Sequence, residues 1–295
     1  MKHGNIYLLW LLTIMFVTSC TNQIAEQSNA SVVEEAATKT AGEVNQADQE
    51  GSVVPVTVPT PDAKTVLLEI YKEKVEETLG SQLSDGRYVG YWNGRQFVRN
   101  GKNYFVAFTE ATPPSEIEYP APEDKVTISQ ATYEFVGNQW QLKNVQQDVG
   151  KFGSNNKAPA AETEKKAQFF SSVSSKYFLA LPSFQIATAG VRLSAFELFA
   201  FSENGTSWQY LGEVDAGLDN SAGCACEADS TSPIECAISR ATVNFISIAN
   251  EEWPSLEVQM TGTEVGADGK VFKLSDKDFV EYKFDVESFE YKKSI

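Results

Sequence analysis

The sequence predicts a mainly β (α+β) fold, in which an N-terminal helix plus antiparallel meander is followed by a larger antiparallel β-sandwich-like or wrapped-sheet segment. Apolar residues recur at helical spacing near residue 60, and from residue 87 the pattern changes to the alternation typical of strands. Turn residues recur about every 8–12 residues through the second half of the chain. Hydrophobic residues make up 42 % of the 295 residues and aromatic residues 12 %, which is enough for a buried core.

The first twenty residues indicate export and lipid attachment. Lys2 gives a basic start, and the mostly apolar stretch Ile6–Val17 follows it. As a helix this stretch is about 18 Å long, too short to span a hydrocarbon core of about 30 Å but typical of a secretory signal peptide. Val17-Thr18-Ser19-Cys20 resembles the lipobox of bacterial lipoproteins, and the resemblance implies that residues 1–19 are removed and that Cys20 is acylated. The alternative is an N-terminal membrane anchor with an incidental cysteine.

Residues 20–59 are expected to form a lipidated, disordered and acidic tether. Residues 21–62 contain seven acidic residues, one basic residue and no aromatic residue. Such a composition buries too little apolar surface to offset the entropy lost on ordering. An edge strand at Val53–Val58 is the alternative for the end of the tether. By analogy with enteric bacteria, Thr21 after the cysteine implies the outer membrane, so we expect a lipid-anchored protein of the bacterial cell envelope.

The segment 60–150 is predicted to hold a helix and an antiparallel sheet. Thr60 can cap the helix with Pro61 at its first position, and Gly80 can end it. The apolar residues that recur at helical spacing are Ala63, Val66, Leu67, Ile70, Tyr71, Val75 and Leu79.

About five short strands follow the predicted helix. Asn93-Gly94 and Asn100-Gly101 are strong signals for tight hairpins, and Gly137-Asn138 is the expected turn of another. Residues 111–124 are rich in proline and acidic residues and predict a long loop. The expected strands are Arg87–Trp92, Gln96–Arg99, Tyr104–Phe108, Val126–Val136 and Gln139–Val145.

The segment 158–295 is predicted to be a β-rich domain with a cysteine-containing loop. Residues 150–160 are expected to be a linker or a long connection, and Glu162–Val173 a short helix. Turn residues then separate a series of strands, as in a sandwich or a wrapped antiparallel sheet. These strands are Tyr177–Leu181, Phe184–Thr188, Ala195–Phe201, Trp208–Val214, Ala237–Ala249, Ser255–Thr261, Val271–Leu274 and Val280–Val286.

Three cysteines in the loop 215–236 are the most specific feature of the globular part, namely Cys224, Cys226 and Cys236. In an exported protein they are disulfide candidates. We expect a bond to Cys236, because a Cys224–Cys226 bond would close a very tight ring, and the residues leave the partner of Cys236 open. A three-cysteine zinc site completed by a carboxylate is the alternative. Asp219–Cys224 resembles a loop of uncharacterised bacterial exported proteins, and this resemblance favours the pair Cys224–Cys236.

The chain lacks the residues that several kinds of chemistry require. Its only histidine is His3, within the segment expected to be removed, which excludes a Ser–His–Asp triad, a Cys–His pair and histidine-ligated zinc or iron. The sequence has no glycine-rich phosphate loop and no nucleophile elbow. A formal net charge of −16 argues against nucleic-acid binding. From sequence we therefore assign no catalytic residue, no metal ligand and no cofactor.

Two weaker patterns point to other ligands. Asp215, Asp219 and Asn220, and a second acidic group within residues 268–278, offer the oxygen ligands that Ca²⁺ prefers, although such residues usually form turns. Ser202–Trp208 loosely resembles the Asp-box hairpin of sialidase-like propellers, but it is one residue shorter and has asparagine in place of aspartate.

The function that the sequence favours is a non-catalytic, membrane-anchored lipoprotein that acts as an interaction or structural module with a protein or glycan partner. The loop 215–236 carries five acidic residues and no basic one, which suits a basic or cation-bearing partner. The alternative is a carbohydrate-binding or histidine-free carbohydrate-active protein, which needs exposed tryptophans among Trp92, Trp140, Trp208 and Trp253. A lipoprotein-trafficking or envelope-assembly factor would need an apolar cavity.

Overall fold

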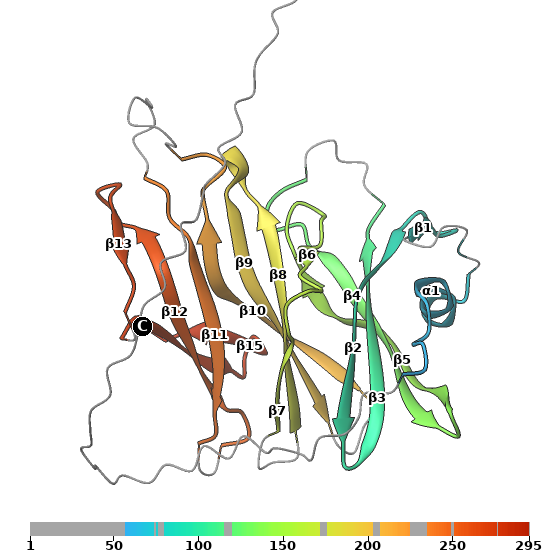
Figure 1. The fold of residues 1–295 in the computed structure, drawn as a ribbon. Helices are drawn as coiled ribbons and strands as arrows, with labels where there is room; N and C mark the ends of the chain where they lie inside the picture. Colours follow the sequence, from blue (N-terminus) through green and yellow to red (C-terminus); the bar gives the residue numbers. More distant parts are fainter. Residues whose placement is uncertain are drawn as a thin grey trace, which may run out of the picture. The chain divides into compact units, whose positions relative to one another are not determined.

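The computed structural model describes residues 57–73, 75, 80–114, 120–171, 176–202, 207–224, 235–248, 251–275 and 277–294. These residues all belong to one compact unit. They form one α-helix and three antiparallel sheets (Figure 1), which confirms the predicted mainly β fold. The predicted signal peptide, Cys20, most of the tether and most of the alternative strand Val53–Val58 lie outside the described residues.

The helix α1 spans Ala63–Tyr71 and is shorter than predicted. Asp62, rather than Thr60, is its N-cap, and the Asp62 carboxylate accepts a hydrogen bond of 2.8 Å from a backbone N–H of the first turn. Lys72 ends the helix in a left-handed conformation with a φ of 61°. The predicted helix end at Gly80 is wrong, because Gly80 is the first residue of strand β1. The buried face of α1 consists of Val66, Leu67, Ile70 and Tyr71.

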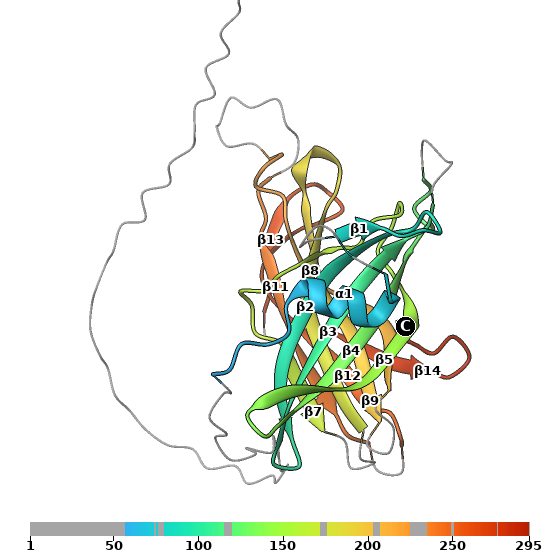
Figure 2. The ribbon, with the colours of Figure 1, turned by 90° about the vertical axis from the view of Figure 1, so that its right-hand side faces the viewer.

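The first sheet is a five-stranded meander, curled like a half-barrel, in which each strand pairs with the next along the chain. The turns Asn100-Gly101 and Gly137-Asn138 have positive φ angles and connect two of its hairpins, as predicted. Helix α1 lies across one face of this sheet (Figure 2). The strands are β1 Gly80–Gln82, β2 Tyr88–Arg99, β3 Lys102–Thr112, β4 Val126–Val136 and β5 Gln139–Phe152.

The dipeptide Asn93-Gly94 is not a turn, contrary to the prediction. Strand β2 continues through it, with a bulge between Tyr91 and Asn93. Aromatic side chains pack directly against Gly94: a Cβ atom there would lie 2.1 Å from the Tyr91 hydroxyl and 2.8 Å from the ring of Phe105. Glycine is needed at this position for close packing rather than for a reversal of the chain.

The second sheet has the strand order β10-β9-β8-β6, and β7 pairs with β8 on the same side as β6. The predicted helix Glu162–Val173 is wrong for the described residues, because β7 forms there. Phe169 stacks on Phe97 of the first sheet, whereas Phe170 stacks on Phe245 of the third. Successive side chains that point to opposite faces are characteristic of a strand. The strands are β6 Ala160–Ala161, β7 Gln168–Ser171, β8 Lys176–Ile186, β9 Arg192–Ser202 and β10 Trp208–Asp219.

The third sheet has the order β11-β12-β14-β15, and β13 pairs with the end of β12. A bridge between Asp219 and Ile238 connects the end of β10 to the residue just before β11. The last strand, β15, was not predicted, because its four residues are too few to show a clear alternation. The strands are β11 Ser239–Ile246, β12 Ser255–Val265, β13 Val271–Lys273, β14 Phe279–Asp285 and β15 Glu290–Lys293.

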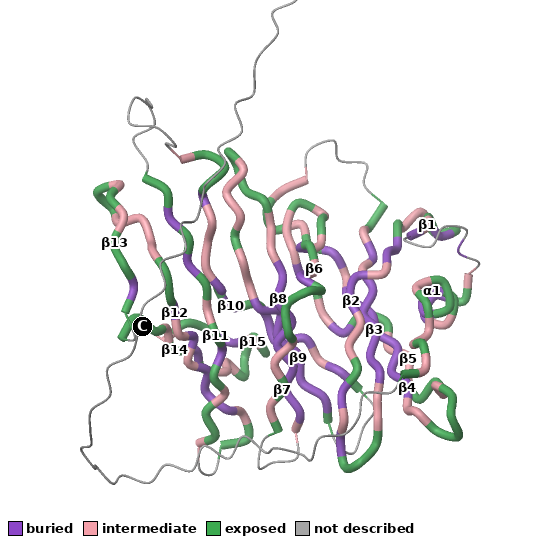
Figure 3. The backbone as a smooth tube through the Cα atoms, viewed as in Figure 1, coloured by how far each residue is buried: buried purple, intermediate pink, exposed green. Residues whose placement is uncertain are grey.

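The second sheet lies between the other two and is buried on both faces (Figure 3). Strand β9 shows this clearly, because the six consecutive residues Phe196–Phe201 are buried. Phe199 belongs to the core shared with the first sheet, and Leu198 to the core shared with the third. The predicted segments 60–150 and 158–295 therefore share a hydrophobic core.

A ring of polar side chains joins the first sheet to the second. The Gln146 side chain on β5 binds the backbone of Trp208 on β10 twice: its Oε1 accepts from the N–H at 2.8 Å, and its Nε2 donates to the carbonyl oxygen at 3.1 Å. The Trp208 indole N–H donates to Thr132 Oγ1 at 2.9 Å. Gln130 closes the ring, accepting from Thr132 and donating to Gln146. Because each member fixes the next, this ring, the Gln146 ring, aligns the two sheets.

Replacing Gln146 with leucine keeps the approximate side-chain volume and removes three hydrogen bonds. We expect the free energy of unfolding, measured with urea, to fall by about 2 kcal/mol, because polar groups at the sheet interface lose their partners. Gln139→Leu, at an exposed position of the same strand, is the matched control and should change that free energy by less than about 0.5 kcal/mol. Equal losses in the two variants would contradict the role of the ring.

Candidate functional site

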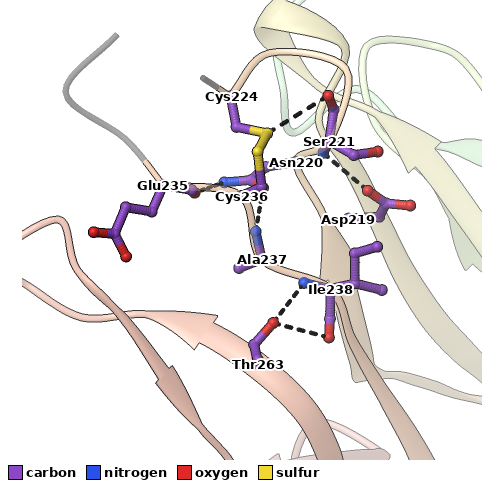
Figure 4. Close-up of a disulfide and its surroundings, with 9 residues drawn as sticks. All are labelled: Asp219, Asn220, Ser221, Cys224, Glu235, Cys236, Ala237, Ile238 and Thr263. Carbon is purple, nitrogen blue, oxygen red and sulfur yellow. Dashed lines mark hydrogen bonds between the residues drawn. A yellow bond between two sulfur atoms is a disulfide. The ribbon is translucent and has the colours of Figure 1, made fainter. Parts of the chain in front are cut away.

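The clearest candidate site is the connection between β10 and β11, where a disulfide joins Cys224 to Cys236 (Figure 4). The two Cα atoms are 5.0 Å apart, and the cysteines are 12 positions apart in the sequence. The bond to Cys236 is confirmed, with Cys224 as its partner. Because the two sulfurs are bonded to each other, neither is a thiolate that can bind zinc, so the alternative three-cysteine zinc site is wrong. Cys226 lies outside the described residues, as do all of residues 225–234.

Asn220 holds the two sides of this connection together. It is buried, its Nδ2 donates to the Glu235 carbonyl oxygen at 3.0 Å, and its Oδ1 accepts from the Ala237 N–H at 2.7 Å. The preceding residue, Asp219, accepts from the Ser221 N–H at 2.9 Å. Hydrogen bonds from Ser221 lower the pKa of Asp219. The disulfide and these hydrogen bonds form a rigid unit, which we call the stapled corner (residues 219–224 and 235–238).

Two neighbouring segments support the stapled corner. The turn between β8 and β9 packs so closely that a Cβ atom on Gly223 would lie 2.7 Å from the Ala189 carbonyl oxygen. On the other side, the Thr263 N–H donates to the Ile238 carbonyl oxygen at 2.8 Å, and the Ile238 N–H donates to Thr263 Oγ1 at 3.0 Å. The corner is therefore fixed to both the second and the third sheet.

The predicted loop 215–236 begins later than expected, because β10 extends to Asp219. Asp215 lies within that strand, opposite Ala195 of β9. The alternative calcium site at Asp215, Asp219 and Asn220 is not formed, because the Asn220 side chain is directed at backbone groups. Within the part of the chain that the structure describes, no three histidine, cysteine, aspartate or glutamate side chains are grouped in a way that could hold a metal ion.

A second unusual group, Glu197 on β9, was missed by the sequence analysis. Its side chain is fully buried on the face that meets the first sheet, and it accepts hydrogen bonds from Ser183 Oγ at 2.8 Å and from the Tyr210 hydroxyl at 2.6 Å. Burial raises the pKa of Glu197 to about 7, and the nearby Glu213 adds to this shift. A carboxyl group without exposed surface cannot reach a substrate, so we interpret it as structural. The sequence feature that could have revealed this buried group is that Glu197 is the one charged residue in the apolar run 195–201.

None of the four tryptophans of the described residues is exposed. Trp92 and Trp208 are buried in the core between the first and second sheets, with 8 % and 2 % of their surface accessible. Trp140 and Trp253 are half-buried, and Trp253 stacks on Phe284 with ring centroids 3.8 Å apart. The exposed tryptophan platforms that a sugar-binding surface was expected to need are therefore not provided by these residues.

Comparison with known proteins does not identify a function for this site. No family model and no curated protein matches the chain. Among the residues that the structure describes, the helix is too short to cross a membrane. Residues 203–206 of the Asp-box-like stretch lie outside the described residues. What the geometry offers is a disulfide-bonded corner, formed by the described residues just before and just after residues 225–234.

Cys236→Ser should lower the free energy of unfolding by about 3 kcal/mol, because the disulfide closes a loop between positions 12 apart and restricts the unfolded chain. Cys224→Ser should cost the same amount, and the double variant no more than either single variant. Urea unfolding with and without a reductant measures this. A wild-type protein whose stability does not change on reduction would contradict the stapled corner.

The raised pKa of Glu197 makes stability depend on pH. An ordinary glutamate in the unfolded chain ionises near pH 4.5, whereas Glu197 in the folded protein ionises near 7. The contribution of protonated Glu197 to the free energy of unfolding is therefore complete below pH 4.5, and it is lost as the pH rises through about 7. Between pH 5 and 8 we expect Glu197 to contribute a fall of about 2–3 kcal/mol in the free energy of unfolding.

Urea unfolding of Glu197→Gln at pH 5 and pH 8 tests this expectation. The variant should lose less stability than the wild type between these two values, by the stated amount. Glu281→Gln, at an exposed position of β14, is the control and should follow the wild-type profile. Parallel profiles for the wild type and Glu197→Gln would show that the carboxyl does not titrate in this range.

Proposed function

We propose that this protein is a non-catalytic lipoprotein of the bacterial cell envelope, anchored through acylated Cys20 and acting as an interaction or structural module. The observation that carries the proposal is the stretch Val17–Cys20, which resembles a lipobox and follows an apolar run of signal-peptide length. The Cys224–Cys236 disulfide supports export, because the cytosol keeps thiols reduced. Both features point to the same oxidising compartment.

The stapled corner supports the interaction role. It holds Cys224 and Glu235, the described residues on either side of residues 225–234, on the body of the protein. A loop with fixed ends loses less conformational entropy on binding than a loop with free ends. The loop and its flanks carry Asp219, Glu227, Asp229 and Glu235 and no lysine or arginine. A basic or cation-bearing protein surface is the partner that this charge fits.

Cys20→Ala should release the protein from the membrane fraction or block its processing, because the acyl chains that hold it there are attached to this sulfur. Fractionation followed by intact-mass analysis measures both effects. Cys226→Ala is the control and should leave the protein in the membrane fraction. An unmodified Cys20 in the mature wild-type protein would contradict the proposal.

A further inference from the structure

The hairpin of β14 and β15 ends in an exposed, partly apolar turn. Asp285 of β14 pairs with Glu290 of β15, so the four residues 286–289 make the turn between the strands, and we call them the hairpin tip. Val286 leaves 65 % of its surface accessible to solvent and Phe289 leaves 48 %. The hairpin projects from the body of the protein, at the right of Figure 2. Two large apolar side chains therefore lie on a protruding part of the molecule.

The backbone of Phe289 is strained. Its φ angle is 59°, in the left-handed region, and its N–H donates to the Asp285 carbonyl oxygen at 2.8 Å to close the turn. Glycine and asparagine adopt this conformation readily, whereas a bulky residue there is an outlier. Among the described non-glycine residues with a positive φ, Phe289 is the only aromatic one. Because asparagine would close this turn with less strain, the backbone conformation does not account for a phenylalanine here.

Contacts within the hairpin fix the tip before any partner arrives. The Phe289 ring meets the ring of Phe284, on β14, edge-on with the centroids 5.7 Å apart. The Asp285 carboxylate accepts from the Glu287 N–H at 2.9 Å and so holds the first half of the turn. Docking of such a preformed tip costs little conformational entropy.

The charges around the tip favour a membrane surface of low net charge. Behind the tip, Asp285 forms an ion pair with Lys292, and Glu281 forms one with Lys283. Glu287 is the one charged residue of the tip itself, and an anionic lipid surface would repel it. Two apolar side chains are too few for the core of a stable protein interface, which buries about 800 Å² per partner. A phospholipid interface, by contrast, accepts single aromatic and apolar side chains, and lysine stems can extend their charge to the headgroups.

We propose that the hairpin tip inserts into the headgroup region of the membrane that carries the lipid anchor, with Val286 and Phe289 as the inserted side chains. The inference rests on the proposed function, because acylated Cys20 places this membrane within reach. As a random coil, the tether predicted for residues 20–59 would have its ends about 35 Å apart. The membrane is then present at a high effective concentration, so a contact of two side chains can orient the body of the protein.

The lipidated full chain, reconstituted into phosphatidylcholine vesicles, tests the insertion. Ser288→Cys in a Cys226→Ala background provides a thiol for a nitrobenzoxadiazole label at the tip, since acylation and the disulfide occupy the other cysteines. Iodide in the water should quench this label at least about twofold less than the same label at Thr242→Cys, an exposed position of β11, because the interface shields an inserted side chain. Equal quenching of the two labels would overturn the proposal and leave the tip to a protein partner.

Phe289→Asn tests the inserted side chain and should raise the quenching of the tip label to that of the Thr242→Cys label. Phe279→Asn removes a similarly exposed phenylalanine from the other end of β14 and, as the matched control, should leave the shielding unchanged. Equal effects of the two variants would overturn the assignment to the tip. In urea, Phe289→Asn should keep or raise the unfolding midpoint, because the turn loses strain; a lowered midpoint would show that the phenylalanine serves stability and would count against the proposal.

Two further measurements separate insertion from anchoring and test the role of charge. Protein that fails to float with the vesicles lacks the anchor and contradicts both this inference and the proposed function, whereas protein that floats with an unshielded tip contradicts the insertion alone. Phosphatidylglycerol in the vesicles should reduce the shielding, and Glu287→Gln should remove this dependence, because the repelled charge is gone. Shielding that increases with phosphatidylglycerol in the wild type would overturn the preference for a neutral surface.

Discussion

Burial of both faces of the second sheet is the constraint on which the rest of the structure depends. Strand β9 places Phe196–Phe201 away from solvent, so each of the other two sheets must cover one of its faces with apolar side chains. Polar groups inside these layers must find partners there. Gln146 therefore pairs with the Trp208 backbone, and Glu197 takes hydrogen bonds from two hydroxyl groups. The hydrogen bonds of Gln146 join the first sheet to the second, whereas those of Glu197 join neighbouring strands within the second sheet.

Two surface features lie instead where the strands of the second sheet end. Ile186, which lines a pocket of about 400 Å³ at the end of β8, is opposite Arg192 across β8 and β9, and Arg192 is opposite Asp219 of the stapled corner. The pocket and the stapled corner thus lie at the same end of this sheet, two strands apart, which is about 10 Å.

The sequence by itself determined the features that depend on neighbouring residues. The mainly β class followed from the alternation of apolar residues, and the strand Val126–Val136 was predicted with its observed bounds. Asn100-Gly101 and Gly137-Asn138 form the predicted turns, because positive φ angles suit these residues wherever the chain places them. The lack of histidine outside His3 excluded several kinds of catalysis without any knowledge of the fold.

Only the tertiary structure decided the features that depend on contacts between distant residues. Asn93-Gly94 became part of a continuous strand, and not a turn, because Phe105 on the adjacent strand packs against the glycine. Residues 168–171 became a strand because their aromatic rings stack on two different sheets. The burial of Glu197 and the pocket beside Lys157 likewise arise where separate strands and turns meet. Local patterns specify backbone conformation, whereas partners and cavities are set by which segments pack together.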